Sequence, residues 1–184
     1  MGLDSNRATV DLEGLHERLR AIEARLERSV TGLLESQNVR MVRGTATLKS
    51  ANQVMVDTGD GIEEVGADHI VIATGSRPRI PEFAVLDGER VLSTRDAYPP
   101  KELPQRLVVI GSGVTGVEFV HMFKSFGSDV TLVVSRQQVL PGKDPEVAAA
   151  LEDDFLRRGV KLLKGARATA IERTADGVVV RCDD

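Results

Sequence analysis

The chain has 184 residues and carries 24 basic and 28 acidic side chains, so its formal net charge is −4 at pH 7. An acidic balance argues against a protein that binds nucleic acid or an anionic membrane surface. Apolar residues make up 41% of the chain, and no apolar run approaches the length of about 20 residues that a membrane-spanning helix requires. We therefore expect a globular protein of one medium or two small domains that neither binds nucleic acid nor enters a membrane.

The first residues and the cysteine count bear on the compartment and on metal binding. Met1-Gly2-Leu3-Asp4 lacks the basic and then apolar stretch of a secretory signal. Cys182 is the single cysteine, which excludes an intramolecular disulfide and a cysteine-based metal site. The three histidines have no spacing that is typical of a metal site. We predict a cytoplasmic protein without a bound metal.

The strongest helix pattern covers residues 11–36. Seven apolar side chains recur there at steps of three and four residues, which places them on one stripe of a helix; they are Leu12, Leu15, Leu19, Ile22, Leu26, Val30 and Leu33. The spacing also permits a coiled coil. Because the run covers only about three and a half heptads and includes Gly14 and Gly32, we favour a single helix docked on the protein.

Short β-prone runs follow at residues 39–42, 46–49, 53–56 and 62–65. Turn-forming residues separate them, so we predict an antiparallel meander. It leads into residues 70–73, an unbroken apolar run that is typical of a buried strand. Five of the seven prolines fall between residues 77 and 105, and we place an inter-domain connection in that region.

Residues 107–163 alternate between strand and helix patterns. Apolar runs predict strands at 107–110, 130–134 and 160–163, with a helix over 114–126. Asp144 and Pro145 have the residue types of an N-cap and a first helical position, so a second helix begins there. This order predicts a right-handed βαβαβ unit, half of a Rossmann-type doubly wound sheet in an α/β protein. A hairpin is expected in residues 169–181.

A G-x-G-x-x-G motif lies between the first strand and the first helix of that unit. Its residues are Gly111, Ser112, Gly113, Val114, Thr115 and Gly116. Gly111 permits a tight turn, Gly113 removes a Cβ from the path of a pyrophosphate, and Gly116 lets the helix lie close to the strand. The helix N-terminus would then face the phosphates of a dinucleotide. The alternative is a glycine-rich turn that binds nothing.

The end of the second strand bears on the choice between NAD and NADP. An NAD-selective site has an acidic residue there, whereas this chain has Val134, Ser135 and Arg136. Arg136 could bind a 2′-phosphate by a charge-assisted hydrogen bond. Gly116 as the third glycine is more usual with NAD, so we expect a site that accepts both NADH and NADPH. A solvated Arg136 that contacts no ligand is the alternative.

Several blocks, in order, resemble the flavin-dependent pyridine nucleotide-disulfide oxidoreductases, which include dihydrolipoyl dehydrogenase and glutathione reductase. Residues 39–46 resemble a strand next to the FAD adenine, and residues 69–78 resemble the family's A-T-G-S-x-P segment. Residues 107–118 resemble its second dinucleotide fingerprint. Residues 134–136 most resemble a dual-specificity branch that holds soluble pyridine nucleotide transhydrogenases and actinobacterial NAD(P)H:quinone reductases.

The resemblance implies hydride transfer from NAD(P)H to FAD and then to a quinone, a nicotinamide nucleotide or a disulfide. It assigns NAD(P) contacts to residues 111–116 and 134–136. It assigns FAD contacts to Thr45, Ala46, Ala73, Thr74, Gly75 and Ser76. Glu118 falls where the family has a glutamate near the nicotinamide ring; its alternative role is an exposed carboxylate in the first part of a helix.

The sequence does not contain the family's first FAD fingerprint, its C-x-x-x-x-C redox pair or its dimerisation domain. We therefore expect an internal fragment with the latter part of the FAD-binding domain in residues 1–80 and a connecting segment in 81–105. Residues 106–184 would form an NAD(P)-binding domain that is incomplete at its carboxyl end. The fragment is expected to bind NAD(P) without transferring hydride, and its parent to be a homodimer. A non-catalytic nucleotide-binding module and an interaction protein acting through residues 11–36 are the alternatives.

Overall fold

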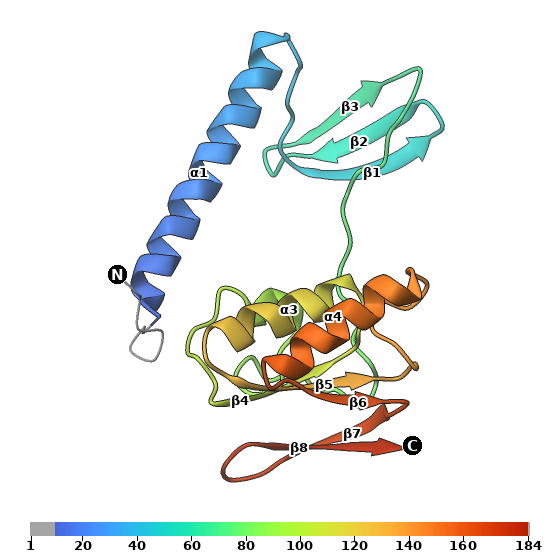
Figure 1. Ribbon diagram of the computed structural model, residues 1–184. Coiled ribbons are helices and arrows are strands. Elements are labelled where there is room, and N and C mark those ends of the chain that lie inside the picture. The colour runs from blue at the N-terminus through green and yellow to red at the C-terminus, as the bar shows by residue number, and fades with distance from the viewer. Residues whose placement is uncertain (1–9, 184) are drawn as a thin grey trace. The chain divides into compact units, whose positions relative to one another are not determined.

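The computed structural model describes residues 10–183, which divide into two compact units (Figure 1). One unit runs from His16 to Arg77, and the other comprises Pro78–Asp184 together with the segment that ends at Leu15. The segment Met1-Gly2-Leu3-Asp4, where we expected no secretory signal, lies outside the described residues. No helix in the described part of the chain is long and apolar enough to cross a membrane.

The first unit holds most of one long helix. Helix α1, Leu12–Ser36, confirms the helix that the pattern of residues 11–36 predicts. It buries none of its side chains, and Leu26, Val30 and Leu33 of its apolar stripe are more than half exposed. Docking of this helix on the protein stays a prediction.

The first unit also holds a three-stranded antiparallel meander. Its strands are β1 Thr45–Ser50, β2 Gln53–Asp57 and β3 Ile62–Gly66, in the order β1-β2-β3. They confirm three of the four predicted runs. The prediction of a strand at residues 39–42 is wrong, because Thr45 already pairs with Asp57 at the end of β2 and the residues before it have no strand opposite them.

The prediction of a buried strand at residues 70–73 is also wrong. This segment has no regular structure, and Val71 and Ile72 are 87% and 70% exposed. A buried parallel strand needs neighbouring strands for its amides and carbonyls and a layer on each face. No strand of residues 10–183 pairs with this segment, so its apolar composition alone does not make it a strand.

The second unit is built on a parallel sheet in the order β4-β5-β6. Its elements are α2 Thr94–Ala97, β4 Arg106–Ile110, α3 Val114–Ser125, β5 Asp129–Val134, α4 Pro145–Arg157 and β6 Lys161–Lys164. Asp144 caps α4 by accepting the amide of Glu146 at 2.8 Å, as predicted. A hairpin of β7 Arg167–Arg173 and β8 Val178–Asp183 follows. The predicted β-α-β-α-β order and the hairpin are confirmed, and the class is α/β with one parallel and two antiparallel sheets.

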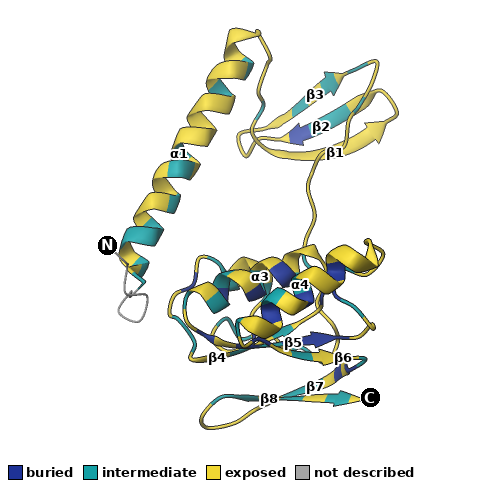
Figure 2. Cartoon of the chain, in the orientation of Figure 1, coloured by how far each residue is buried: buried dark blue, intermediate teal, exposed yellow. Residues whose placement is uncertain are grey.

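Strand β5 separates two apolar clusters because its side chains alternate between the faces of the sheet. Val130, Leu132 and Val134 are at most 1% exposed and pack against α3 and α4 (Figure 2). Val133 points to the opposite face, where it packs with Ala166 and Ala168 at the start of the hairpin. The two helices therefore cover one face of the sheet, and the hairpin region covers part of the other.

Residues 87–90, within the predicted connection of residues 81–105, contact the hairpin of the second unit. Asp87 accepts the backbone amides of residues 89–91 at 2.8–2.9 Å, and it pairs with Arg173 of β7 at 3.1 Å. Arg90 donates to the carbonyls of Thr174 and Ala175 in the turn of the hairpin, at 3.1 and 3.2 Å. The segment that the prolines marked as a connection is thus fixed by side-chain contacts to one unit.

The contacts of Asp87 make the stability of the second unit depend on pH. Three backbone amides, that of Val91 foremost, and then the charge of Arg173 lower the pKa of Asp87 from 3.8 to about 2. Because this folded-state pKa lies below the unfolded one, the carboxylate stabilises the fold above about pH 4, and this contribution is lost as the pH falls toward 2. We expect Asp87→Asn to lower the melting temperature clearly at pH 7 and much less at pH 2.5.

Asp153→Asn provides the control, because Asp153 is exposed on α4. It should leave the melting temperature close to that of the wild type at both pH values. If Asp87→Asn lowered the melting temperature equally at pH 7 and pH 2.5, the carboxylate charge would not be the stabilising element.

Candidate nucleotide-binding site

The turn between β4 and α3 consists of residues 111–113 and is fixed from two sides. Gly111 has a φ of +111°, in the region that favours glycine. Its amide donates to the carbonyl of Val133 on β5 at 3.1 Å. On the other side, the carbonyl of Ser112 accepts the amide of Leu140 at 2.7 Å. The position of the turn is therefore set by the neighbouring strand and by the loop that follows it.

The glycines of the turn differ in what a side chain would meet. A Cβ on Gly116 would overlap the carbonyl oxygen of Gly111, so the close approach of α3 to the turn requires glycine there. A Cβ on Gly113 would meet no atom within 4 Å, and its φ of −70° is ordinary for any residue. The fold itself thus does not require glycine at 113. A small residue is needed at this place if a ligand approaches the backbone from outside.

The turn opens onto the N-terminus of α3. Gly113 is the N-cap of this helix, and no side chain caps it there. The first amides of a helix have no acceptor within the helix, and they carry the positive end of its dipole. Val114 and Thr115, the next two residues, are exposed. The arrangement is suited to an anion such as a diphosphate.

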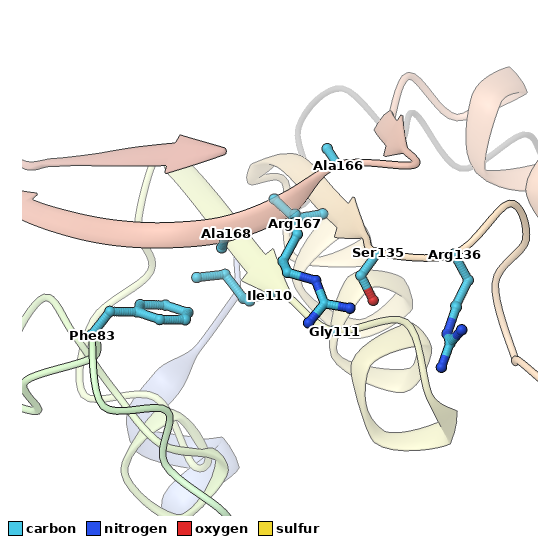
Figure 3. Close-up of a pocket in the computed structure, with 9 residues that line it drawn as sticks. Phe83, Ile110, Gly111, Ser135, Arg136, Ala166, Arg167 and Ala168 are labelled. Carbon is cyan, nitrogen blue, oxygen red and sulfur yellow. The ribbon is translucent and has the colours of Figure 1, made fainter. Parts of the chain in front are cut away.

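A cavity of about 210 Å³ lies beside the turn (Figure 3). It is at the edge of the sheet where the parallel strands β4 and β5 end, because Ile110 pairs with Val133. Its lining residues are Phe83, Ile110, Gly111, Val133, Ser135, Arg136, Ala166, Arg167 and Ala168. No acidic residue is among them. Since whole-ligand pockets usually measure about 300–1,000 Å³, this cavity has room for part of a dinucleotide.

The structure brings some of the predicted NAD(P) residues together at this cavity and not others. Gly111, Ser135 and Arg136 line it. Val134 is fully buried in the core between the sheet and the helices, so only its backbone is available to a ligand. Glu118 is exposed on α3 and does not line the cavity.

The six predicted FAD residues lie in the unit of residues 16–77, at two separate places in the chain. Thr45 and Ala46 begin β1, and both are exposed. Residues 73–76 belong to the irregular segment after the meander, where Gly75 has a φ of +73°. Their role as FAD contacts stays a prediction.

The comparison with protein families identifies the chain. The model described as "Pyridine nucleotide-disulphide oxidoreductase" matches residues 5–184, nearly the whole sequence. The chain belongs to the pyridine nucleotide-disulphide oxidoreductase family. This confirms the resemblance that the motifs indicated.

Members of the family are similar to this chain over part of their length. The NAD(P)H dehydrogenase (quinone) of Mycobacterium tuberculosis is 38% identical over 189 residues, which cover 99% of this chain and 38% of that protein. The dihydrolipoyl dehydrogenase of Bacillus subtilis is 30% identical, with 94% of this chain and 38% of that protein covered. The crystal structure of LpdA from M. tuberculosis superposes with a TM-score of 0.83 at 37% identity, covering 95% and 40% of the two chains. The chain thus spans about two fifths of these pyridine nucleotide-disulphide oxidoreductases.

Sequence reasoning missed six of the nine residues that line the cavity in this member of the family, and Arg167 and Phe83 are the two with large side chains from other segments. Arg167 lies after β6, which runs parallel to β5, so topology could have placed it at the same edge of the sheet as Arg136. Phe83 comes from the proline-rich segment, and no sequence pattern marked it.

A buried carboxylate supports the loop that carries Arg136. Glu152 of α4 is 8% exposed. Its Oε1 accepts the amide of Val139 at 2.9 Å, and its Oε2 pairs with Nζ of Lys164 at 2.8 Å. Glu152 therefore connects α4, the loop after β5 and the end of β6, and it holds the backbone on one side of the cavity.

Proposed function

We propose that this chain binds NADH and NADPH at the turn of residues 111–116 and in the cavity beside it. The glycine at position 113 supports this most. The fold leaves open space for a side chain at Gly113, and the backbone angles of this residue are accessible to any amino acid, so the fold does not explain why glycine is present. The uncapped N-terminus of α3 and the cationic cavity support it further. Residues 112–116 would hold the diphosphate, and Ser135 and Arg136 would meet the adenosine ribose.

Calorimetric titration of the purified chain with NADH and with NADPH tests this proposal. We expect saturable binding of both nucleotides. The absence of any heat of binding up to millimolar nucleotide would contradict the proposal.

We further propose that the whole protein is a flavoprotein that moves hydride from NAD(P)H to FAD and then to a quinone, a nicotinamide nucleotide or a disulfide. Membership of the family and similarity to an NAD(P)H dehydrogenase (quinone) support this. When bound, FAD would accept the hydride and pass on the electrons. In this proposal residues 1–80 belong to the FAD-binding domain, 81–105 connect the domains and 106–184 belong to a Rossmann-type NAD(P)-binding domain. The whole protein would act as a homodimer.

Within this proposal each predicted residue has a role. Glu118 would lie near the nicotinamide ring. The residues that would contact FAD are Thr45, Ala46, Ala73, Thr74, Gly75 and Ser76.

A second candidate function for the 184 residues by themselves is nucleotide binding without catalysis. The exposed and irregular state of residues 71–76 favours it, because this segment contains Ala73, Thr74, Gly75 and Ser76, which would contact FAD. The absorption band of bound flavin distinguishes the two functions. After incubation with FAD and gel filtration, a retained flavin absorption band supports the flavoprotein function of the chain, and loss of the band with retained NADPH binding supports the binding module.

A further inference from the structure

Two arginine side chains without acidic partners line the same cavity. Arg136 and Arg167 both contribute to its wall, and neither forms an ion pair with any of residues 10–183. Some arginines of this unit do form ion pairs, for example Arg158 with Asp154, Arg173 with Asp87, and Arg181 with Glu172. Because no acidic residue lines the cavity, two like charges remain there uncompensated, and an anion between them would be stabilised by both.

The backbone at both arginines is fixed at one edge of the sheet. Val134 and Lys164 are paired in the register of β5 and β6. Two residues beyond Val134, the carbonyl of Arg136 accepts the amide of Gly165 at 3.0 Å. Arg167 follows Gly165 by two residues. The backbone of Arg136, after β5, and that of Arg167, the first residue of β7, are therefore held beside the ends of β5 and β6, and both side chains are exposed.

The side chains are directed toward the region where a nucleotide would lie. In the close-up, the guanidinium group of Arg167 extends toward Gly111 and Ser135, and Arg136 lies on the other side of Ser135 in this view (Figure 3). Ser135, after the last residue of β5, thus lies between the two arginines in this view, and all three residues line the cavity. A phosphate near Ser135 is the ligand group that fits this arrangement, because guanidinium groups bind phosphate oxygens through two parallel hydrogen bonds.

We propose that Arg167 is a specificity-determining residue that, together with Arg136, binds the 2′-phosphate of NADP(H) and makes the site prefer it over NAD(H). This rests on the proposed function, in which the diphosphate occupies the turn at residues 111–116. The turn at residues 111–116 would bind the negative charge of the diphosphate. A second anion-binding subsite at the end of β5 therefore corresponds to the 2′ position of the adenosine ribose. A 2′-hydroxyl would instead call for a carboxylate, and none lines the cavity.

The experiment compares NADP⁺ and NAD⁺ by calorimetric titration of the full chain. Arg167→Gln removes the charge and keeps a side chain of similar polarity. Arg157→Gln is the matched control, because Arg157 is an exposed arginine on α4 that does not line the cavity. Circular dichroism and thermal unfolding of each variant establish that the fold is retained.

We expect the wild type to bind NADP⁺ more tightly than NAD⁺. Arg167→Gln should weaken NADP⁺ binding by about tenfold or more, as loss of a hydrogen bond to a charged group does, and change NAD⁺ binding by less than about twofold. The double variant Arg136→Gln/Arg167→Gln should bind the two nucleotides equally. The control should bind both as the wild type does.

Three results would overturn the inference. Equal losses of affinity for NADP⁺ and NAD⁺ in Arg167→Gln would show that Arg167 contacts a group that both nucleotides contain, such as the adenine ring. A wild type that binds both nucleotides with the same affinity would overturn the preference but leave the proposed function in place. A wild type that binds neither would overturn both.

Discussion

Gly113→Val abolishes binding of both NADH and NADPH and leaves the chain folded. A Cβ at this position meets no atom of the protein within 4 Å, and the backbone angles of Gly113 are accessible to valine. Valine is a poorer N-cap than glycine, which costs about 1 kcal/mol of stability. Its two methyl groups, however, project into the space in front of the first amides of α3. The diphosphate would occupy that space, so no alternative approach to these amides remains.

Calorimetric titration with each nucleotide and circular dichroism of the same sample measure the two parts of this expectation. Gly177→Val is the matched control, because a Cβ on Gly177 also meets no atom within 4 Å and this residue lies in the turn of the hairpin, away from the cavity. The control should bind both nucleotides as the wild type does. Wild-type affinity in Gly113→Val would mean that the diphosphate does not occupy the turn.

Phe155→Ala removes about 3–5 kcal/mol from the free energy of unfolding. Phe155 is fully buried and is the largest of the fully buried side chains. It packs in the cluster that joins α4 to α3 and to β5, so its removal leaves a cavity under the part of the sheet that carries the site. Since domains are stable by about 5–15 kcal/mol in total, this single change takes away a large share.

Urea unfolding followed by circular dichroism measures the loss of stability in Phe155→Ala. Leu156→Ala is the control, because Leu156 is the next residue on α4 and is 55% exposed. It should change the free energy of unfolding by less than about 0.5 kcal/mol. A loss below about 1 kcal/mol in Phe155→Ala would show that this cluster is not the core of the second unit.

The parts of the fold that sequence could predict are those set by local patterns. The apolar stripe of residues 11–36, the hairpin at the end of the chain and the Asp144 cap each depend on residues close together in sequence, and all three were found. Residues 39–42 and 70–73 have strand-like composition but no strand beside them. Strand formation depends on a partner far away in sequence, which composition does not reveal.

In the candidate site, too, the residues within one local motif could be predicted from the sequence, and those from distant segments could not. The turn of residues 111–116 is one continuous motif, so the tight turn at Gly111 and the close packing at Gly116 could be predicted from the sequence, whereas the role of Gly113 toward a ligand stays a prediction. Arg167 and Phe83 reach the cavity from segments about 30 residues to either side of Arg136 and Gly111. Their approach results from the pairing of β6 with β5 and from the packing of the proline-rich segment, which are tertiary features.

Amide nuclear magnetic resonance of the ¹⁵N-labelled chain during titration with NADP⁺ tests the central claim most directly, because it reports which backbone groups meet the nucleotide. We expect the largest shifts on residues 111–116 and 135–136, with further shifts on residues 165–168 around Arg167. Saturating shifts confined to other residues, or no shifts at millimolar NADP⁺, would contradict it.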